Sequence, residues 1–582
     1  MSKPEIRFDA WNPGLSSELP VELLPEITLY RPENSETRYR EAKQAAEFCG
    51  LRPEEMVAFK LERLAMHDVL IRVTTELFVP DGPNYEDLGI NLRNMASRIL
   101  EGWVRPALPE LEAEFSRLRA RVKQTLAERL DADIFQRRAP EDTAGKTGIW
   151  ERLFGQKQPQ SSKEPFFPEL VALSEWRDGL DAIEDPFEHA CIQALLMVVG
   201  GIVGQRGRLM ADKDLVVSHA SNLVCNSFGS RLVSSLIEPI FQRAVESEGY
   251  RLLPCQSRPF VMNVKGASAA GKSTIRPLQL ELAERLGVDW TDFALVSPDY
   301  WRKFLLDYDS LGENFKYAAM LTGHELEIID KKLDAYMEEK AADAKMPHLL
   351  IDRFRFDSFR LSTNQQTDGR LLSRFGHTVF IFFIITPPTE TVERAWTRGQ
   401  ETGRYKAVDD LLFHNVEAYT GMPELFLTWV SKEHPKVHFE FLDNDVAYGT
   451  RPRTVAFGWN GEITILDPDC MRRMNAYKQI NVDATCPEEV YLGTADSGDI
   501  LATFIERIPK VSFIGKEDGA LLARFSGGEC RFTTEGFLSR TGLEGFSRQG
   551  NICGAGLILR DEDRDGTALD LERERHFTLG AW

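Results

Sequence analysis

The chain has 582 residues, of which 43% are hydrophobic and 27% charged, and its formal net charge is −20. This length suggests three or four domains of ordinary globular composition. So acidic a chain argues against general binding to nucleic-acid backbones or to anionic membranes, because both carry negative charge.

The eight cysteines and the N-terminal residues indicate a cytoplasmic protein. No two cysteines have the spacing of a metal knuckle or a redox pair, which favours buried thiols in a reducing compartment. The first residues contain no apolar signal-peptide core. The most apolar stretch, residues 190–204, is short for a membrane span and favours a buried helix, so we expect no membrane association.

Residues 1–138 are expected to form an α-helical domain. Within it, residues 109–130 place apolar side chains at helical spacing, and the charged stripes indicate solvated faces. Residues 139–166 have the composition of a linker. Helical character returns at residues 167–250, which we expect to pack on the domain that follows, with one helix that ends or kinks at Pro239.

Residues 255–450 alternate short apolar runs with helical patterns, which is typical of an α/β fold whose parallel sheet carries helices on both faces. The expected strands lie at residues 260–264, 293–296, 348–351, 379–385 and 437–442. The expected helices lie at residues 275–286, 326–345, 389–398 and 406–419. Residues 451–582 are expected to form a separate β-rich, α+β domain, with short strands at 454–466, 511–514, 521–525 and 557–559.

Directly after the first expected strand, the sequence G-A-S-A-A-G-K-S-T fills the phosphate-loop template G-x-x-x-x-G-K-[ST]. Backbone N–H groups of such a loop, with the helix N-terminus behind it, hold phosphate oxygens. We expect Lys272 to reach the β- and γ-phosphates of ATP and the Ser273 hydroxyl to hold Mg²⁺. Pro277 predicts a kink or a tight start in the helix that follows. The expected ATP-binding residues of the loop are Gly266, Ala267, Ser268, Ala269, Ala270, Gly271, Lys272, Ser273 and Thr274.

Two carboxylates follow expected strands, where ligands of a parallel sheet bind. Asp299 comes after the second strand and is the candidate general base, although a turn aspartate that caps a helix start has the same local sequence. Asp352 ends the third strand as a second phosphate-side carboxylate, and together with Ser273 it is the candidate Mg²⁺ ligand.

Polar residues near the end of this region are candidates for contacts with the nucleotide. Arg394, Arg398 and Arg404 are expected to form a lid over the transferred phosphate, or else a solvated basic face. Asn444 closes the last strand, where it either contacts the adenine of ATP or forms a plain turn.

With these motifs in place, residues 259–445 resemble the zeta-toxin-like P-loop kinase family. The motifs that carry the resemblance are G-A-S-A-A-G-K-S, S-P-D, L-T-G-H-E-L, L-L-I-D, the arginine segment and L-D-N-D. The resemblance implies that Lys272 binds phosphate, that Asp299 is the general base and that the arginines form the lid. It also implies that Glu325 and Asp352 lie near the substrate. Members of the family phosphorylate hydroxyls, often on a UDP-linked amino sugar.

One departure from the family concerns the acceptor site. The acidic strand of the family usually ends Glu-Gly-Thr, whereas here Asp352 precedes R-F-R-F. These larger residues would reshape the acceptor pocket. Arg353 and Arg355 are candidate substrate-binding residues that either hold an anionic acceptor or pair with Asp352 or Asp357.

The leading hypothesis is a kinase that uses ATP and Mg²⁺ to phosphorylate a hydroxyl of a small molecule, such as a nucleotide-linked sugar or a nucleotide. The alternatives are an NTPase switch whose hydrolysis moves the flanking regions, and a scaffold that binds nucleotide without transfer. The N-terminal helical region and the C-terminal region are candidates for binding a protein partner.

Overall fold

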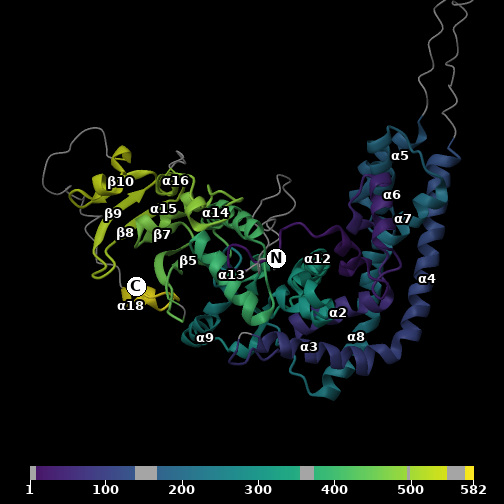
Figure 1. Cartoon of the computed structure of the whole chain (residues 1–582), viewed down its shortest axis with the longest axis horizontal. Coiled ribbons are helices and arrows are strands. Elements are labelled where there is room, and N and C mark those ends of the chain that lie inside the picture. The colour runs from purple at the N-terminus through teal and green to yellow at the C-terminus, as the bar shows by residue number, and fades with distance from the viewer. Residues whose placement is uncertain are drawn as a thin grey trace, which may run out of the picture. The chain divides into compact units, whose positions relative to one another are not determined.

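The computed structural model describes residues 8–84, 86–137, 167–353, 372–447, 449–493, 499–546 and 571–582. The chain forms two compact units (Figure 1). The sheet unit consists of Met1–Val21, Leu70–Ala96 and Ser247–Trp582, and the helical unit of Glu22–Val69 and Ser97–Glu246. These units differ from the expected domain boundaries, because residues 451–582 belong to the sheet unit and residues 167–246 group with the earlier helices.

A ten-stranded mixed sheet runs through the sheet unit in the order β10-β9-β8-β7-β6-β5-β4-β1-β3-β2. Its first five strands in the chain are all parallel, as expected for an α/β fold. They are β1 (Phe260–Lys265), β2 (Phe293–Val296), β3 (His348–Asp352), β4 (Thr378–Ile385) and β5 (Lys436–Asp443). β1 lies between β3 and β4, so its carboxyl end is at the point where the strand order reverses. Ligands of parallel sheets usually bind at this point.

Helices connect the parallel strands, and two of them extend further than the sequence predicted. Thus α13 and α14 continue for several residues beyond the expected ends, since apolar side chains of α14 remain buried as far as Val430. The helices of this part are α9 (Arg276–Arg285), α10 (Arg302–Leu305), α11 (Ala318–Leu321), α12 (Gly323–Ala342), α13 (Pro388–Thr402) and α14 (Val408–Val430).

The strands after residue 450 continue the same sheet and do not form a layer of their own. β6 pairs antiparallel with β5, and β8 runs parallel to β7. The strands are β6 (Arg453–Trp459), β7 (Glu462–Ile465), β8 (Lys510–Ile514), β9 (Leu521–Ser526) and β10 (Glu529–Thr533). The helices are α15 (Pro468–Tyr477), α16 (Ile500–Arg507), α17 (Phe537–Thr541) and α18 (Leu571–Arg575). The strand expected at 557–559 lies outside the described residues.

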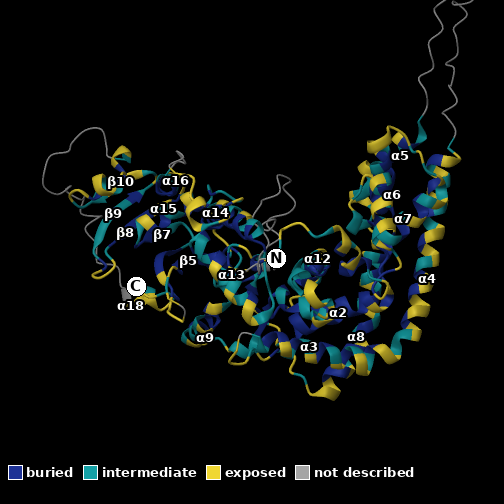
Figure 2. Ribbon diagram, in the orientation of Figure 1, coloured by how far each residue is buried: buried dark blue, intermediate teal, exposed yellow. Residues whose placement is uncertain are grey.

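The helical unit contains long amphipathic helices. Along α4, buried apolar residues recur at helical spacing, and its opposite face is exposed, as the charge pattern predicted (Figure 2). The helices of this part are α1 (Tyr39–Cys49), α4 (Arg105–Leu130), α5 (Pro168–Gly179), α6 (Pro186–Arg206), α7 (Lys213–Asn226) and α8 (Phe228–Glu248). α2 (Leu61–Glu76) and α3 (Asp87–Ile99) contribute residues to both units.

Two helices, α8 and α6, correspond to segments for which the sequence made specific predictions. α8 continues through Pro239 to Glu248, so the expected end at Pro239 is wrong. Apolar residues on both sides of the proline, including Ile237 and Phe241, are buried, and this packing outweighs the lost backbone hydrogen bond. α6 is the one helix in the described ranges whose length and composition would allow it to cross a membrane, and 44% of its most apolar window is buried.

The C-terminal residues dock on β5 through a buried carboxylate. Glu440 is fully buried and accepts hydrogen bonds from the amides of Leu579 (2.7 Å) and Gly580 (3.0 Å) and from the Thr454 hydroxyl (2.7 Å). Burial raises the pKa of Glu440 to about 7, although these hydrogen bonds oppose the rise. Glu440 therefore makes the attachment of the C-terminus sensitive to pH.

We expect this carboxyl group to make the folded chain less stable as the pH rises. Its pKa increases from 4.5 to about 7 on folding. Its contribution to the free energy of unfolding is therefore complete below about pH 4.5 and is lost as the pH rises through about 7, a change of about 3 kcal/mol. Glu440→Gln should remove this part of the pH dependence in urea unfolding, whereas Glu517→Gln, at an exposed position, should keep it. Equal pH slopes for wild type and Glu440→Gln would refute the assignment.

Candidate functional site

The loop between β1 and α9 contains two residues in the left-handed backbone region. They are Ala269, with φ 61°, and Gly271, with φ 95°. A Cβ atom at Gly271 would lie 2.3 Å from the side-chain nitrogen of Asn444, so a larger residue fits neither the backbone angle nor the space. Left-handed backbone at a non-glycine residue such as Ala269 is uncommon and is typical of functional loops.

The loop is attached to the ends of two neighbouring strands through one carbonyl group. The Ala270 oxygen accepts hydrogen bonds from the Asn444 side-chain amide (2.8 Å) and the Thr386 hydroxyl (3.0 Å). The buried Tyr419 hydroxyl bonds in turn to the backbone of Thr386. Asn444 thus braces the loop, a role that the sequence did not predict. Thr386 and Tyr419 were missed because no local motif marks them.

The start of α9 follows the expected tight geometry. A 3₁₀ turn covers Lys272–Ile275, and the α-helix begins at Arg276. Pro277 therefore lies in the first turn of α9, where its missing N–H removes no hydrogen bond within the helix.

The candidate phosphate-binding and metal-binding side chains of the loop, Lys272 and Ser273, have different partners. Lys272 Nζ donates hydrogen bonds to the carbonyls of Gly266 (3.2 Å) and Ala267 (2.9 Å). Burial lowers the pKa of Lys272, while the charges of Asp352 and Asp299 oppose this. Ser273 Oγ donates to Asp352 Oδ2 at 2.9 Å. Ser273 and Asp352, the two candidate Mg²⁺ ligands, therefore lie within hydrogen-bond distance of each other.

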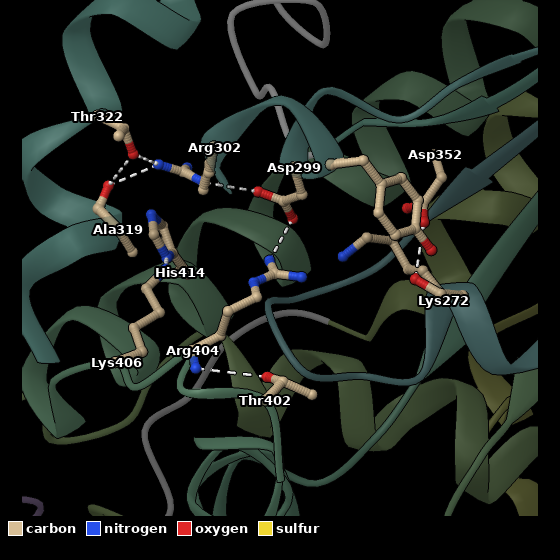
Figure 3. A network of polar contacts seen from close by, with 12 residues as sticks. Lys272, Asp299, Arg302, Ala319, Thr322, Asp352, Thr402, Arg404, Lys406 and His414 are labelled. Atoms are coloured by element: carbon tan, nitrogen blue, oxygen red, sulfur yellow. Dashed lines mark hydrogen bonds and ion pairs between the residues drawn. The ribbon is translucent and has the colours of Figure 1, made fainter. Parts of the chain in front are cut away.

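Asp299 lies between two arginines at the carboxyl end of β2 (Figure 3). Arg302 Nε is 3.0 Å from one carboxylate oxygen of Asp299, and Arg404 Nη2 is 2.7 Å from the other. Burial alone would raise the pKa of Asp299, but the charges of Arg404 and Arg302 hold it well below its usual value. Arg302 also donates to the Ala319 carbonyl and the Thr322 hydroxyl, so Asp299 is tied to α11 and the start of α12.

Arg302 was not among the predicted site residues, although a local signal for it exists. Asp299 and Arg302 are three residues apart in a helical turn, and side chains at that spacing meet on one face. The neighbouring Lys406 and His414 come from the loop before α14 and from α14 itself, and no motif indicated them.

Positive charge accumulates around Asp299. The charge of Arg398 lowers the pKa of both Lys272 and Asp299, so this arginine acts on the same cluster. Burial lowers the pKa of Lys406 to about 8, against the charge of Asp410. Burial and the adjacent Lys406 lower the pKa of His414 to about 2, so this histidine is neutral. Lys272 and Asp352 lie on one side of Asp299, and Lys406 and His414 on the other (Figure 3).

The three arginines expected in the lid separate into two positions. Arg404 and Arg398 belong to the cluster around Asp299. Arg394 instead donates to the backbone carbonyls of Asn444 (2.8 Å) and Val446 (3.4 Å), beside the end of β5.

Arg353, a candidate substrate-binding residue, pairs with two carboxylates of α12 in this structure. Its guanidinium group is 2.5 Å from the carboxylates of both Asp330 and Asp334 on α12. The Arg353 side chain is only 6% exposed, so it is a buried structural cation. The sequence suggested other partners because the approach of α12 to the end of β3 depends on tertiary packing.

Two further candidates for substrate binding were named from the sequence, Glu325 and Arg355. Glu325, expected near the substrate, is fully buried in the first turn of α12. Arg355 lies outside the described residues.

A structural role for Arg353 makes a direct prediction. Arg353→Leu should lower the free energy of unfolding by roughly 3–5 kcal/mol, because it removes the buried cation that lies 2.5 Å from both Asp330 and Asp334. Urea unfolding of the full chain measures this. The exposed ion pair of Arg531 provides the control, and Arg531→Leu should change stability by less than about 1 kcal/mol. If Arg353→Leu is as stable as wild type, the ion-pair assignment is wrong.

The donor set at the loop fits Mg²⁺ held jointly with a nucleotide. The described residues contain no group of three or more His, Cys, Asp or Glu side chains arranged to hold a metal. Ser273 and Asp352 supply one hydroxyl and one carboxylate within hydrogen-bond distance of each other. Mg²⁺ is commonly held by one or two protein oxygens together with substrate phosphates and waters.

Comparison of the chain with protein-family models, with curated proteins and with solved structures finds no match. The resemblance to zeta-toxin-like kinases therefore remains one of sequence motifs.

Proposed function

We propose that this protein is a phosphotransferase that moves the γ-phosphate of ATP to a hydroxyl of a small molecule. The observation that carries the proposal is a concentration of positive charge in a chain whose net charge is −20. Five cations gather around two carboxylates beside a loop with the phosphate-loop sequence. The cations are Lys272, Arg302, Arg398, Arg404 and Lys406, and the carboxylates are Asp299 and Asp352.

The loop and its lysine supply the nucleotide site in this proposal. Backbone N–H groups of residues 266–274 bind the phosphate oxygens, assisted by the N-terminal end of α9. Lys272 exchanges its carbonyl partners for the β- and γ-phosphates. Ser273 and Asp352 would hold Mg²⁺, which neutralises charge on the phosphates.

Asp299 accepts the proton of the acceptor in the proposed transfer. The acceptor oxygen attacks the γ-phosphorus, and the bond from that phosphorus to the bridging oxygen of ADP breaks. The hydroxyl proton moves to a carboxylate oxygen of Asp299. The products are ADP and a phosphate ester, and the cations of the cluster stabilise the charge that spreads over the transferred group.

In this proposal the position of Arg404 controls the proton affinity of Asp299. While Arg404 pairs with Asp299, the carboxylate is held ionised and binds protons weakly. When Arg404 turns to the transferred phosphoryl group, its positive charge moves away from the Asp299 carboxylate. The proton affinity of Asp299 then rises. The base thus becomes effective as the phosphate arrives.

Incubation of the full chain with γ-labelled ATP, Mg²⁺ and a metabolite extract tests the proposal. We expect the label in a small organic phosphate ester, identified by mass spectrometry. If the label appears only as inorganic phosphate, the protein is an NTPase and the transferase assignment fails.

A further inference from the structure

A cavity of about 480 Å³ lies within the sheet unit next to the cluster around Asp299. Its walls come from α3, from α10 and the segment that follows it, and from the turn before Arg404. The lining residues used below are Arg93, Lys303, Asp307, Tyr308, Asp309 and Phe315. A second, smaller cavity shares Arg93, Lys303 and Tyr308 with it and is also lined by Asp299 and Arg404. The two cavities therefore share part of their walls, and the smaller one reaches the proposed base, Asp299.

A polar atom is left without a partner where the two cavities meet. The Tyr308 hydroxyl is buried and makes no hydrogen bond with any residue that the structure describes. The charges of Arg302, Arg404 and Asp299 all act on this hydroxyl, so it lies close to the cluster. Unsatisfied buried hydroxyls are rare, and one that lines a cavity is a candidate to bond a ligand.

The charges that line the cavity differ in exposure. Arg93 and Lys303 are half-buried, whereas Asp307 and Asp309 are exposed. Lys303 Nζ is 3.2 Å from Glu86 Oε1, and the charge of the same carboxylate also acts on Arg93. Burial lowers the pKa of Arg93, although the charge of Glu86 opposes this. An acidic ligand group would compensate the charge of Arg93.

We propose that this cavity is the acceptor site and that it selects a molecule with an acidic group, held by Arg93, beside the hydroxyl that is phosphorylated. The inference rests on the proposed transferase function. Tyr308 bonds the acceptor near its reacting hydroxyl, and Phe315 supplies an apolar wall. Arg93 comes from α3, outside the residues that resemble the kinase family, so the N-terminal part of the chain contributes to acceptor choice.

Fractionation of the metabolite extract tests the acidic group directly. A strong anion exchanger at about pH 11, where most amino groups are neutral, separates acidic compounds from all others. Each fraction is then neutralised and incubated with the full chain, γ-labelled ATP and Mg²⁺. We expect the labelled product from the retained fraction only. Phosphatase treatment of that fraction, followed by removal of the phosphatase, distinguishes the two sources: loss of the acceptor identifies a phosphate, and its survival a carboxylate.

Variants of Arg93 show whether this residue holds the acidic group. Arg93→Gln should raise the KM for the retained fraction roughly 10- to 100-fold, more than it lowers kcat, as expected for a lost charge-assisted hydrogen bond. Arg93→Lys should restore part of the affinity. Arg98→Gln, the same substitution at an exposed position of α3, is the matched control and should leave KM within about twofold of wild type.

The outcomes separate this inference from the proposed function. Label from the unretained fraction, or an Arg93→Gln protein that behaves like Arg98→Gln, overturns the acidic acceptor but leaves the kinase intact. Label from neither fraction overturns the transferase function, and the inference falls with it. Thermal unfolding of each variant shows whether it is folded. If Arg93→Gln does not fold, the KM of Arg93→Lys is compared with that of wild type instead.

Discussion

Replacing Asp299 by asparagine is expected to lower the rate of phosphoryl transfer by at least about a hundredfold, the lower range for loss of a general base. Asparagine keeps the size of the side chain but cannot accept the proton of the acceptor hydroxyl. ATP binding should persist, because the loop residues and Lys272 are unchanged. The measurement is initial rate with γ-labelled ATP, accompanied by ATP titration of the same protein.

Two comparisons make this result specific. Asp469→Asn, at a carboxylate whose side chain is 96% exposed, should transfer phosphate at the wild-type rate. Arg302 and Arg404 lose a charged partner in Asp299→Asn, so its thermal unfolding must be compared with that of wild type. A folded Asp299→Asn protein with full activity would remove Asp299 from the mechanism.

The Lys272→Ala protein is expected to lose measurable ATP binding and, with it, phosphoryl transfer. The ammonium group is the only cation contributed by the loop itself, and it lies beside Asp352 and the carbonyls of Gly266 and Ala267. Hydrogen bonds between charged groups contribute roughly 1.5–3 kcal/mol each, so two lost phosphate contacts weaken binding by roughly a hundredfold or more.

Calorimetric titration with ATP and Mg²⁺ measures the affinity of the Lys272 variant. Lys510→Ala removes an exposed lysine at the start of β8 and should bind ATP as wild type does. Unchanged affinity in a folded Lys272→Ala protein would contradict the assignment of the loop.

The parallel strands were predictable from sequence to within two residues at each end. Each is a short run of apolar residues that is buried on both faces and bounded by polar residues, as in β3, where only Asp352 is partly exposed. The strand after residue 450 that the sequence missed, β10, has the mixed burial of a sheet edge, with only Cys530 fully buried. Its polar residues break the apolar pattern that marks a strand.

The candidate site residues were predictable where they belong to one local sequence motif. Contacts between residues of distant segments were less predictable. The loop residues were named from the strand, loop and helix pattern, and Asp352 from the end of the third strand, but their hydrogen bond was not predicted. The pairing of Arg353 with α12, the bracing role of Asn444 and the contribution of Arg93 each require two distant segments to meet. Hydrophobic periodicity and motif spacing do not predict contacts between segments that are far apart in the sequence.

Hydrogen–deuterium exchange on the full chain, with and without ATP and Mg²⁺, tests most directly whether a triphosphate binds at the loop. Nucleotide should slow exchange of the amides in residues 266–274, because their N–H groups become bonded to phosphate oxygens. Protection should extend to the segment that carries Arg398 and Arg404, and both effects should disappear in Lys272→Ala. Unchanged exchange of the loop amides at saturating ATP, or protection confined to other residues, would contradict the account.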